Sequence, residues 1–132
     1  MDTMRQDDSA RQEGAASRYD IPLSFGEAHL IVNRIGEDLN LLFAGGERPH
    51  IGCTVLALPR PSLTGDGSTS ATASVINVTG HKDEAVCRYL AEEVCRKTGR
   101  TVVCTGGFHM DGITPEQIRE VTGAVENCCQ NL

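Results

Sequence analysis

The first two thirds of the chain alternate short apolar or mixed segments with links rich in Gly, Pro and Asp. A period of two residues indicates β-strands, because successive side chains of a strand point to opposite faces. The pattern predicts four consecutive strands, over residues 23–35, 39–44, 51–58 and 70–78. The segment PRPSLTGDGSTS, residues 59–70, is predicted to be a mobile loop, either a lid or a plain linker.

From residue 82 the hydrophobic period lengthens to that of a helix. Val86, Leu90 and Val94 recur every four positions, and Gly99 follows the last turn. Apolar residues at this spacing share one helix face, and glycine is common just beyond a helix end. The pattern therefore predicts an amphipathic helix over residues 82–99.

A fifth strand and a second helix are predicted after it. RTVVCT, residues 100–105, is a short apolar run typical of a buried strand. Residues 114–130 form a second amphipathic pattern with a strong start signal: Thr114 as N-cap, Pro115 at the first helical position and Gln117 completing a capping box.

These elements give the order β-β-β-β-α-β-α and an α+β fold. Four consecutive strands favour a mostly antiparallel β-sheet, with the two helices on one face. The other face or an edge then needs a cover, which a homodimer would provide. We expect a polar N-terminal tail over residues 1–18 and a single domain over residues 19–132.

Charge and composition argue against nucleic acid and membrane partners. The 132 residues have a formal net charge of −6, no Trp and only 4% aromatic residues, whereas duplexes need a basic face and single strands need stacking platforms. No segment approaches the roughly 20 apolar residues of a membrane span, and the N-terminus lacks the apolar stretch of a secretory signal. We therefore expect a cytoplasmic location. The six cysteines form no CxxC pair, and most are expected to fill the core.

Three segments place a histidine beside glycine where a strand gives way to a loop or helix: AGGERPHIG, VTGHKDE and TGGFHMDGITPEQI. If they gather at one end of the sheet, their backbone N–H groups, lysine and imidazoles form a pocket suited to a phosphorylated planar ligand or a metal ion. Each segment alone also has an ordinary explanation: a hairpin turn at His50, a solvated Lys82 paired with a neighbouring acid, or a local turn at Asp111. The candidate binding residues are Gly45, Gly46, Pro49, His50, Gly52, Gly80, His81, Lys82, Gly106, Gly107, His109 and Asp111.

The three segments, in the same order and spacing between Asp38 and Ile118, resemble the small D subunit of gallate decarboxylase and its relatives. This is the prenylated-flavin chaperone family, formerly described as amino acid decarboxylases. The family pattern usually has Ile where this chain has Phe108. The resemblance implies a dimer with a fold similar to the proteasome-assembly-chaperone type. It also implies binding of prenylated FMN, and assistance with its maturation or its delivery to a prenylated-flavin-dependent decarboxylase.

The resemblance further implies roles for the candidate residues. The flavin phosphate would lie at the helix start between Gly80 and Lys82, where free backbone N–H groups favour an anion. The isoalloxazine ring would approach the backbone beside the glycine pairs of the first and third segments. His50 and His109 would hydrogen-bond the polar edge of the ring or manage a proton during its oxidation, since imidazole titrates near neutral pH.

Two other functions are compatible with the sequence. A metal-dependent enzyme could use His50, His81, His109 and Asp111, although these ligands would come from three separated loops. A partner-only assembly chaperone would have an exposed apolar patch and no bound chromophore. Amino acid decarboxylation by the chain itself is not expected, because no lysine has the surroundings of a Schiff-base site.

Overall fold

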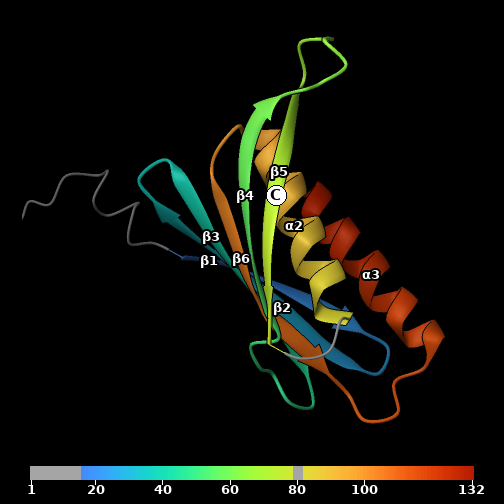
Figure 1. The fold of residues 1–132 in the computed structure, drawn as a ribbon. Coiled ribbons are helices and arrows are strands. Elements are labelled where there is room, and N and C mark those ends of the chain that lie inside the picture. The colour runs from blue at the N-terminus through green and yellow to red at the C-terminus, as the bar shows by residue number, and fades with distance from the viewer. Residues whose placement is uncertain (1–15, 79–81) are drawn as a thin grey trace, which may run out of the picture.

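One layer of the protein is a β-sheet and the other is a pair of helices (Figure 1). The computed structural model describes residues 16–78 and 82–132. Within them the strands are β1 (Ala16–Leu23), β2 (Gly26–Ile35), β3 (Asp38–Gly46), β4 (Cys53–Pro61), β5 (Thr69–Asn77) and β6 (Val102–His109), and the helices are α2 (Lys82–Thr98) and α3 (Pro115–Gln130). The predicted α+β class is confirmed.

The strand order across the sheet is β1-β2-β3-β6-β4-β5. Each neighbouring pair is antiparallel except β3 and β6, which run parallel. The prediction of a mostly antiparallel sheet is therefore confirmed. The chain passes through α2 before it forms β6, and β6 lies between β3 and β4 in the sheet. Because β3 and β6 are parallel, their carboxyl ends lie at the same end of the sheet.

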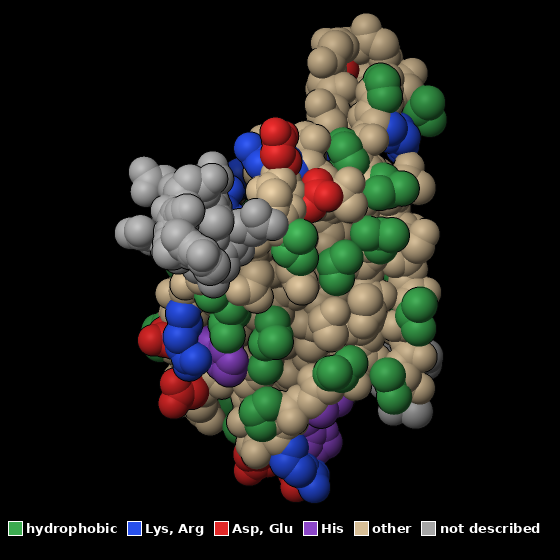
Figure 2. Space-filling model, turned by 90° about the vertical axis from the view of Figure 1, so that its left-hand side faces the viewer, with side chains coloured by type: hydrophobic (Ala, Val, Ile, Leu, Met, Phe, Trp, Pro, Cys, Tyr) green, Lys and Arg blue, Asp and Glu red, His purple; other side chains and the backbone are tan. Residues whose placement is uncertain are grey.

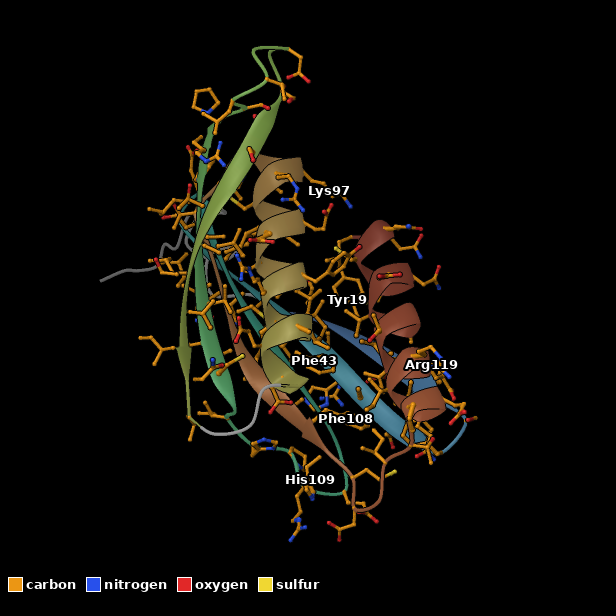
Figure 3. All side chains as sticks on the ribbon, turned by 45° about the vertical axis from the view of Figure 1, so that its right-hand side comes forward. Tyr19, Phe43, Lys97, Phe108, His109 and Arg119 are labelled. Carbon is orange, nitrogen blue, oxygen red and sulfur yellow. The ribbon has the colours of Figure 1, made fainter. Side chains whose placement is uncertain are left out.

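Both helices pack on the same face of the sheet, as predicted (Figures 1 and 3). α2 contacts β4, β5 and β6, and α3 contacts β1 and α2. α3 begins with the predicted capping box. The Thr114 hydroxyl accepts a hydrogen bond from the Gln117 N–H at 3.1 Å, and the Gln117 side chain accepts one from the Thr114 N–H at 2.9 Å. In the part of the chain that the structure describes, no helix is long and apolar enough to cross a membrane.

The core lies between the sheet and the helices and follows the period of each element. Leu30, Leu41 and Phe43 on the strands and Leu90 and Val125 on the helices are at most 1% exposed. Strand residues alternate between this core and the opposite face, while each helix turns one face toward it. All six cysteines are free thiols, and those in the core are Cys53, Cys87, Cys95, Cys104 and Cys129.

The N-terminal strand β1 corrects one prediction. The predicted tail extends to residue 18 and the first predicted strand covers residues 23–35. The structure instead has a strand from Ala16, a short turn, and a second strand from Gly26. The observed order is therefore β-β-β-β-β-α-β-α, with one more strand before the first helix than the sequence predicts.

Charged residues hide the alternation of β1. Tyr19, Ile21 and Leu23 belong to the core or pack against it, whereas Arg18 and Asp20, on either side of Tyr19, form an exposed ion pair. β1 is an edge strand, and charged outward residues are common there because they discourage pairing with other chains. The segment therefore has the period of a strand but the composition of a polar tail.

β4 also continues further than predicted. The predicted loop begins at residue 59, whereas β4 runs to Pro61 and pairs with β5 over its whole length. On its other side, β4 pairs with β6 only from Cys53 to Ala57. Pro59 and Pro61 therefore lie where one side of β4 is open, and the N–H that proline lacks is not needed by an inner strand pair.

Candidate functional site

The ends of β3 and β6 bring two of the three glycine–histidine segments together. Parallel pairing places Gly46 beside His109. The connection from β3 to β4 then folds over the end of β6, because the Glu47 N–H donates to the His109 carbonyl at 2.7 Å and the Gly52 N–H donates to the Gly106 carbonyl at 2.9 Å. This is the end of the sheet at which His109 is labelled in Figure 3. The condition stated for a pocket, that the segments gather at one end of the sheet, is met by these two segments.

The third segment, VTGHKDE, lies partly outside the described residues. Gly80 and His81 fall there, and Lys82 begins α2 without a described side chain. The next residue, Asp83, is described. It connects α2 to the other two segments.

Asp83 is the central acceptor of this end of the sheet. Its carboxylate is only 11% exposed. It accepts a hydrogen bond from the Phe108 N–H at 2.9 Å and lies 3.0 Å from His50 Nε2. The other ring nitrogen of His50 lies 3.1 Å from the Arg48 carbonyl. Since both ring nitrogens face acceptors, only a ring with a proton on each nitrogen donates to both at once.

Arg48, His109 and Asp111 form a second polar group beside the first. Arg48 Nη2 lies 2.9 Å from His109 Nε2 and 2.8 Å from Asp111 Oδ1, and the last two atoms are 2.8 Å apart. The hydrogen bond from His109 and the charge of Arg48 lower the pKa of Asp111 below its usual value. Arg48 and Asp111 are mostly exposed, at 67% and 74%, and exposed ion pairs are weak. The guanidinium can therefore exchange Asp111 for an incoming anion. The rings of His50 and His109 meet edge to face, with centroids 6.3 Å apart.

The glycines of this region make room for the protein's own atoms. A Cβ on Gly52 would overlap the Asp83 carboxylate, and one on Gly107 would lie 2.8 Å from His50 Nε2. Without these two glycines, the contact between His50 and Asp83 could not form in this geometry. At the other three glycines an added Cβ would collide with neighbouring backbone: that of Ala28 at Gly45, of His109 at Gly46 and of Phe43 at Gly106. From the sequence, these glycines are expected to let a ligand approach the backbone closely. In the structure, their lack of a side chain is also required by contacts within the protein.

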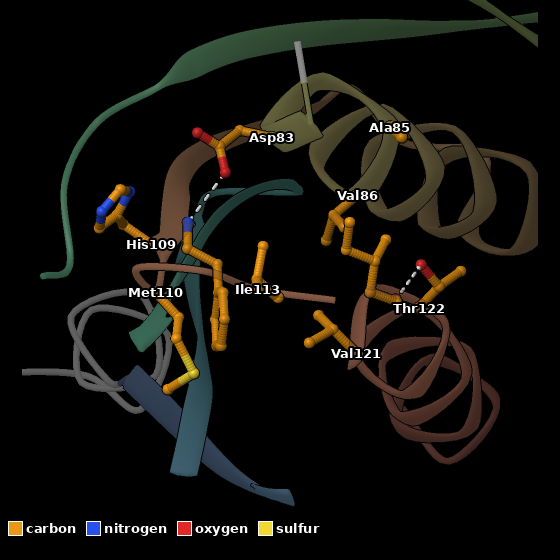
Figure 4. A pocket seen from close by; sticks show the side chains of 10 residues that line it. Asp83, Ala85, Val86, His109, Met110, Ile113, Val121 and Thr122 are labelled. Atoms are coloured by element: carbon orange, nitrogen blue, oxygen red, sulfur yellow. Dashed lines mark hydrogen bonds between the residues drawn. The ribbon is translucent and has the colours of Figure 1, made fainter. Parts of the chain in front are cut away.

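An apolar cavity of about 220 Å³ opens beside the polar residues (Figure 4). It lies between the start of α2, the end of β6 and the first turns of α3. Its lining consists of Asp83, Ala85, Val86, Phe108, His109, Met110, Ile113, Ile118, Val121 and Thr122. The ring of Phe108 is held by an edge-to-face contact with Phe25, with centroids 6.2 Å apart. The sequence predicts a polar pocket at this end of the sheet, but it does not predict an apolar cavity beside it.

Buried thiols lie behind the site but are not reactive groups. Burial raises the pKa of Cys53 to about 12. A hydrogen bond with Cys104, together with burial, raises the pKa of Cys87 far above its usual value. The thiolate is the nucleophilic and metal-binding form. These cysteines therefore stay protonated and act as core residues.

Most of the predicted site residues lie at this end of the sheet: Gly45, Gly46, Pro49, His50, Gly52, Gly106, Gly107, His109 and Asp111. Their binding of a cofactor stays a prediction. Among residues 16–78 and 82–132, no group of three or more His, Cys, Asp or Glu side chains is arranged to hold a metal ion. The sequence-based interpretation overlooked Arg48 and Asp83, although both stand within the quoted segments.

Comparison with known proteins addresses both fold and family. No curated protein matches the sequence significantly. Among solved structures, the chain is similar to one described as the crystal structure of a novel chaperone complex for yeast 20S proteasome assembly. The TM-score is 0.53 and the identity 14%, over 89% of this chain and 93% of the other. This similarity confirms the predicted fold type and concerns the fold alone. Residues 27–132 match the family model of the prenylated flavin chaperone LpdD-like domain. The chain belongs to that family of prenylated flavin chaperones, as its three segments predict.

Proposed function

We propose that this protein binds prenylated FMN at the end of the sheet where β3, β6 and α2 meet, and assists its maturation or its delivery to a prenylated-flavin-dependent decarboxylase. The observation that carries the proposal is the meeting of a polar group, Arg48, His50 and His109, with an apolar cavity of about 220 Å³, in a member of this family. A flavin nucleotide needs both, because it joins a phosphate and a polar ring edge to a flat apolar body.

The donors at the site fit such a ligand. Arg48 is a mostly exposed guanidinium, the side chain best suited to phosphate because its planar N–H groups donate in pairs. The segment from Gly80 to Lys82, of which only Lys82 belongs to the described part of α2, is the other place proposed for the phosphate, since the first N–H groups of a helix favour anions. When bound, the flavin supplies the electron-accepting chemistry that the client enzyme uses.

The two histidines are proposed to face the polar edge of the flavin. His50 is held between Asp83 and the Arg48 carbonyl, so it can keep a proton in a fixed position. His109 Nε2 has two partners of opposite kind, the Arg48 donor and the Asp111 acceptor. It can therefore accept or donate according to its tautomer. These are the properties of groups that hold a proton near a ring whose oxidation state changes.

The face of the sheet opposite the helices, which no helix or strand of the described residues covers, is proposed to bind protein. Opposite the helices, the exposed apolar side chains include Leu42, Leu56, Leu58 and Ile76 (Figure 2). Contiguous apolar patches on soluble proteins mark interaction surfaces. We propose that a second copy of the chain covers this face, and that the client decarboxylase is a further partner. Light scattering after size exclusion tests the dimer: a Leu56→Lys variant should be monomeric, and a wild-type protein of 14.2 kDa in solution would contradict it.

Anaerobic titration with prenylated FMN tests the binding site. The Arg48→Met variant should bind about tenfold more weakly or worse, since hydrogen bonds to charged groups are each worth about 1.5–3 kcal/mol. Arg18→Met is a matched control, because Arg18 is also an exposed arginine paired with an aspartate, on β1. The histidine assignment fails if both His50→Ala and His109→Ala bind as well as the wild type.

Two measurements separate this proposal from its rivals. A purified protein with stoichiometric metal would favour a metal-dependent enzyme that uses His50, His81, His109 and Asp111. A colourless protein that binds no flavin but still captures a decarboxylase would favour a chaperone that recognises only its partner. The uncovered apolar face is compatible with that second function as well.

A further inference from the structure

The cavity shares two residues with the polar group, which here includes Asp83 and Asp111 as well as Arg48, His50 and His109. Asp83 and His109 line the cavity and also belong to the hydrogen-bonded contacts with His50, Arg48 and Asp111. A ligand that contacts the polar group therefore lies at the opening of an apolar space. The rest of the lining is mainly aliphatic or aromatic, and it comes from α2, β6, α3 and the loop between β6 and α3 (Figure 4).

Each polar side chain of the lining, Asp83, His109 and Thr122, already has a hydrogen-bonding partner within the protein. One Asp83 oxygen accepts from the Phe108 N–H and the other faces His50. The Thr122 hydroxyl donates to the Ile118 carbonyl at 3.0 Å. A polar ligand group that entered deep among the aliphatic side chains would lose its water and find few partners in exchange, which is unfavourable. A hydrocarbon group would lose nothing of this kind and would gain from burial.

The cavity is also large enough for such a group. A closed apolar cavity of about 150 Å³ stays dry and binds benzene, and this one measures about 220 Å³. Because this cavity is open at the polar residues, a ligand can enter it from the site. The Phe108 ring, fixed against Phe25, adds an aromatic surface.

We infer that this cavity accepts the hydrocarbon group that distinguishes prenylated FMN from FMN, and that it makes the protein selective for the prenylated form. The inference rests on the proposed function. The polar edge of the flavin remains with Arg48 and the histidines, while the prenyl-derived part enters between α2 and α3. The aliphatic residues of the two helices that would contact it are Ala85 and Val86 on α2 and Ile118 and Val121 on α3.

The test compares affinities for the two flavins in variants that fill the cavity. Val86→Phe inserts a ring from α2. Thr122→Leu adds bulk from an exposed position of α3, so it keeps the test valid if Val86→Phe does not fold. Gln130→Leu adds the same side chain at an exposed position of α3 that does not line the cavity. Circular dichroism establishes folding, and anaerobic fluorescence titration gives the affinity of each variant for FMN and for prenylated FMN.

The wild type and Gln130→Leu should prefer prenylated FMN by about sixtyfold, if about three methylene-sized groups are buried at roughly fourfold each. A folded cavity-filling variant should lose most of this preference through weaker binding of prenylated FMN, with its FMN affinity within about threefold of the wild type. The inference is overturned, and the proposed function left standing, if the wild type binds both flavins equally or the filled variants keep the full preference. A wild type that binds neither flavin overturns both.

Discussion

Replacing Asp83 with alanine should lower the free energy of unfolding by about 2–4 kcal/mol. The carboxylate is 11% exposed and serves two donors from different parts of the chain, the Phe108 N–H and the His50 ring. Its removal leaves a partly buried N–H without an acceptor, and hydrogen bonds to charged groups are worth about 1.5–3 kcal/mol. The lost negative charge near the start of α2 adds about 0.3–1 kcal/mol.

Urea unfolding followed by circular dichroism measures this effect. Glu116→Ala is the matched control, because Glu116 is also a first-turn acid, on α3, but is 78% exposed with its partner Arg119 3.7 Å away. That control should cost less than about 1 kcal/mol. A double-mutant cycle with His50→Ala should give a coupling energy above about 0.5 kcal/mol. If Asp83→Ala costs no more than Glu116→Ala, Asp83 is not the residue that joins α2 to the ends of the sheet.

Three further predictions concern glycines and pH. Gly52→Ala should destabilise the protein by more than about 1 kcal/mol in urea unfolding, because a Cβ there overlaps the Asp83 carboxylate; wild-type stability would contradict this. Gly123→Ala should instead stabilise α3 by about 0.5–1 kcal/mol and raise the Tm, because its Cβ would meet nothing within 4 Å; an unchanged or lower Tm would contradict it. Hydrogen bonds from Ser24 lower the pKa of Glu120 below its ordinary value of 4.5, so this contact stabilises the fold above that pH and is lost as pH falls through the lower folded-state pKa. Glu120→Gln should accordingly be less stable than the wild type at neutral pH, and a difference that persists at strongly acidic pH would refute the assignment.

Local signals in the sequence were enough for the elements whose pattern is local. The capping box of Thr114 and Gln117 and the four-residue period of α2 lie within a few positions, and both helices are confirmed. β1 was missed for a physical reason: an edge strand tolerates charges such as Arg18 and Asp20 between its inward residues. The extent of β4 could not be predicted either, because Pro59 interrupts a strand only where both sides of that strand are paired.

The candidate site depended on contacts that sequence spacing does not contain. Asp83 meets His50 across 33 positions and Phe108 across 25, so its position in the first helical turn indicated only a favourable helix charge. The same holds for Arg48, whose partner Asp111 lies 63 positions away. The glycine–histidine segments did predict that these strand ends would gather. The cavity could not be predicted, because its volume depends on how far α2, α3 and the end of β6 stand apart.

The central claim, that this chain carries prenylated FMN, is tested most directly by co-expressing it with a flavin prenyltransferase. The protein is then purified without oxygen, and the absorption spectrum and the mass of any released ligand are recorded. The account predicts that prenylated FMN is released in a stoichiometric amount relative to the protein. A purified protein that is folded, colourless and free of flavin under these conditions would contradict it.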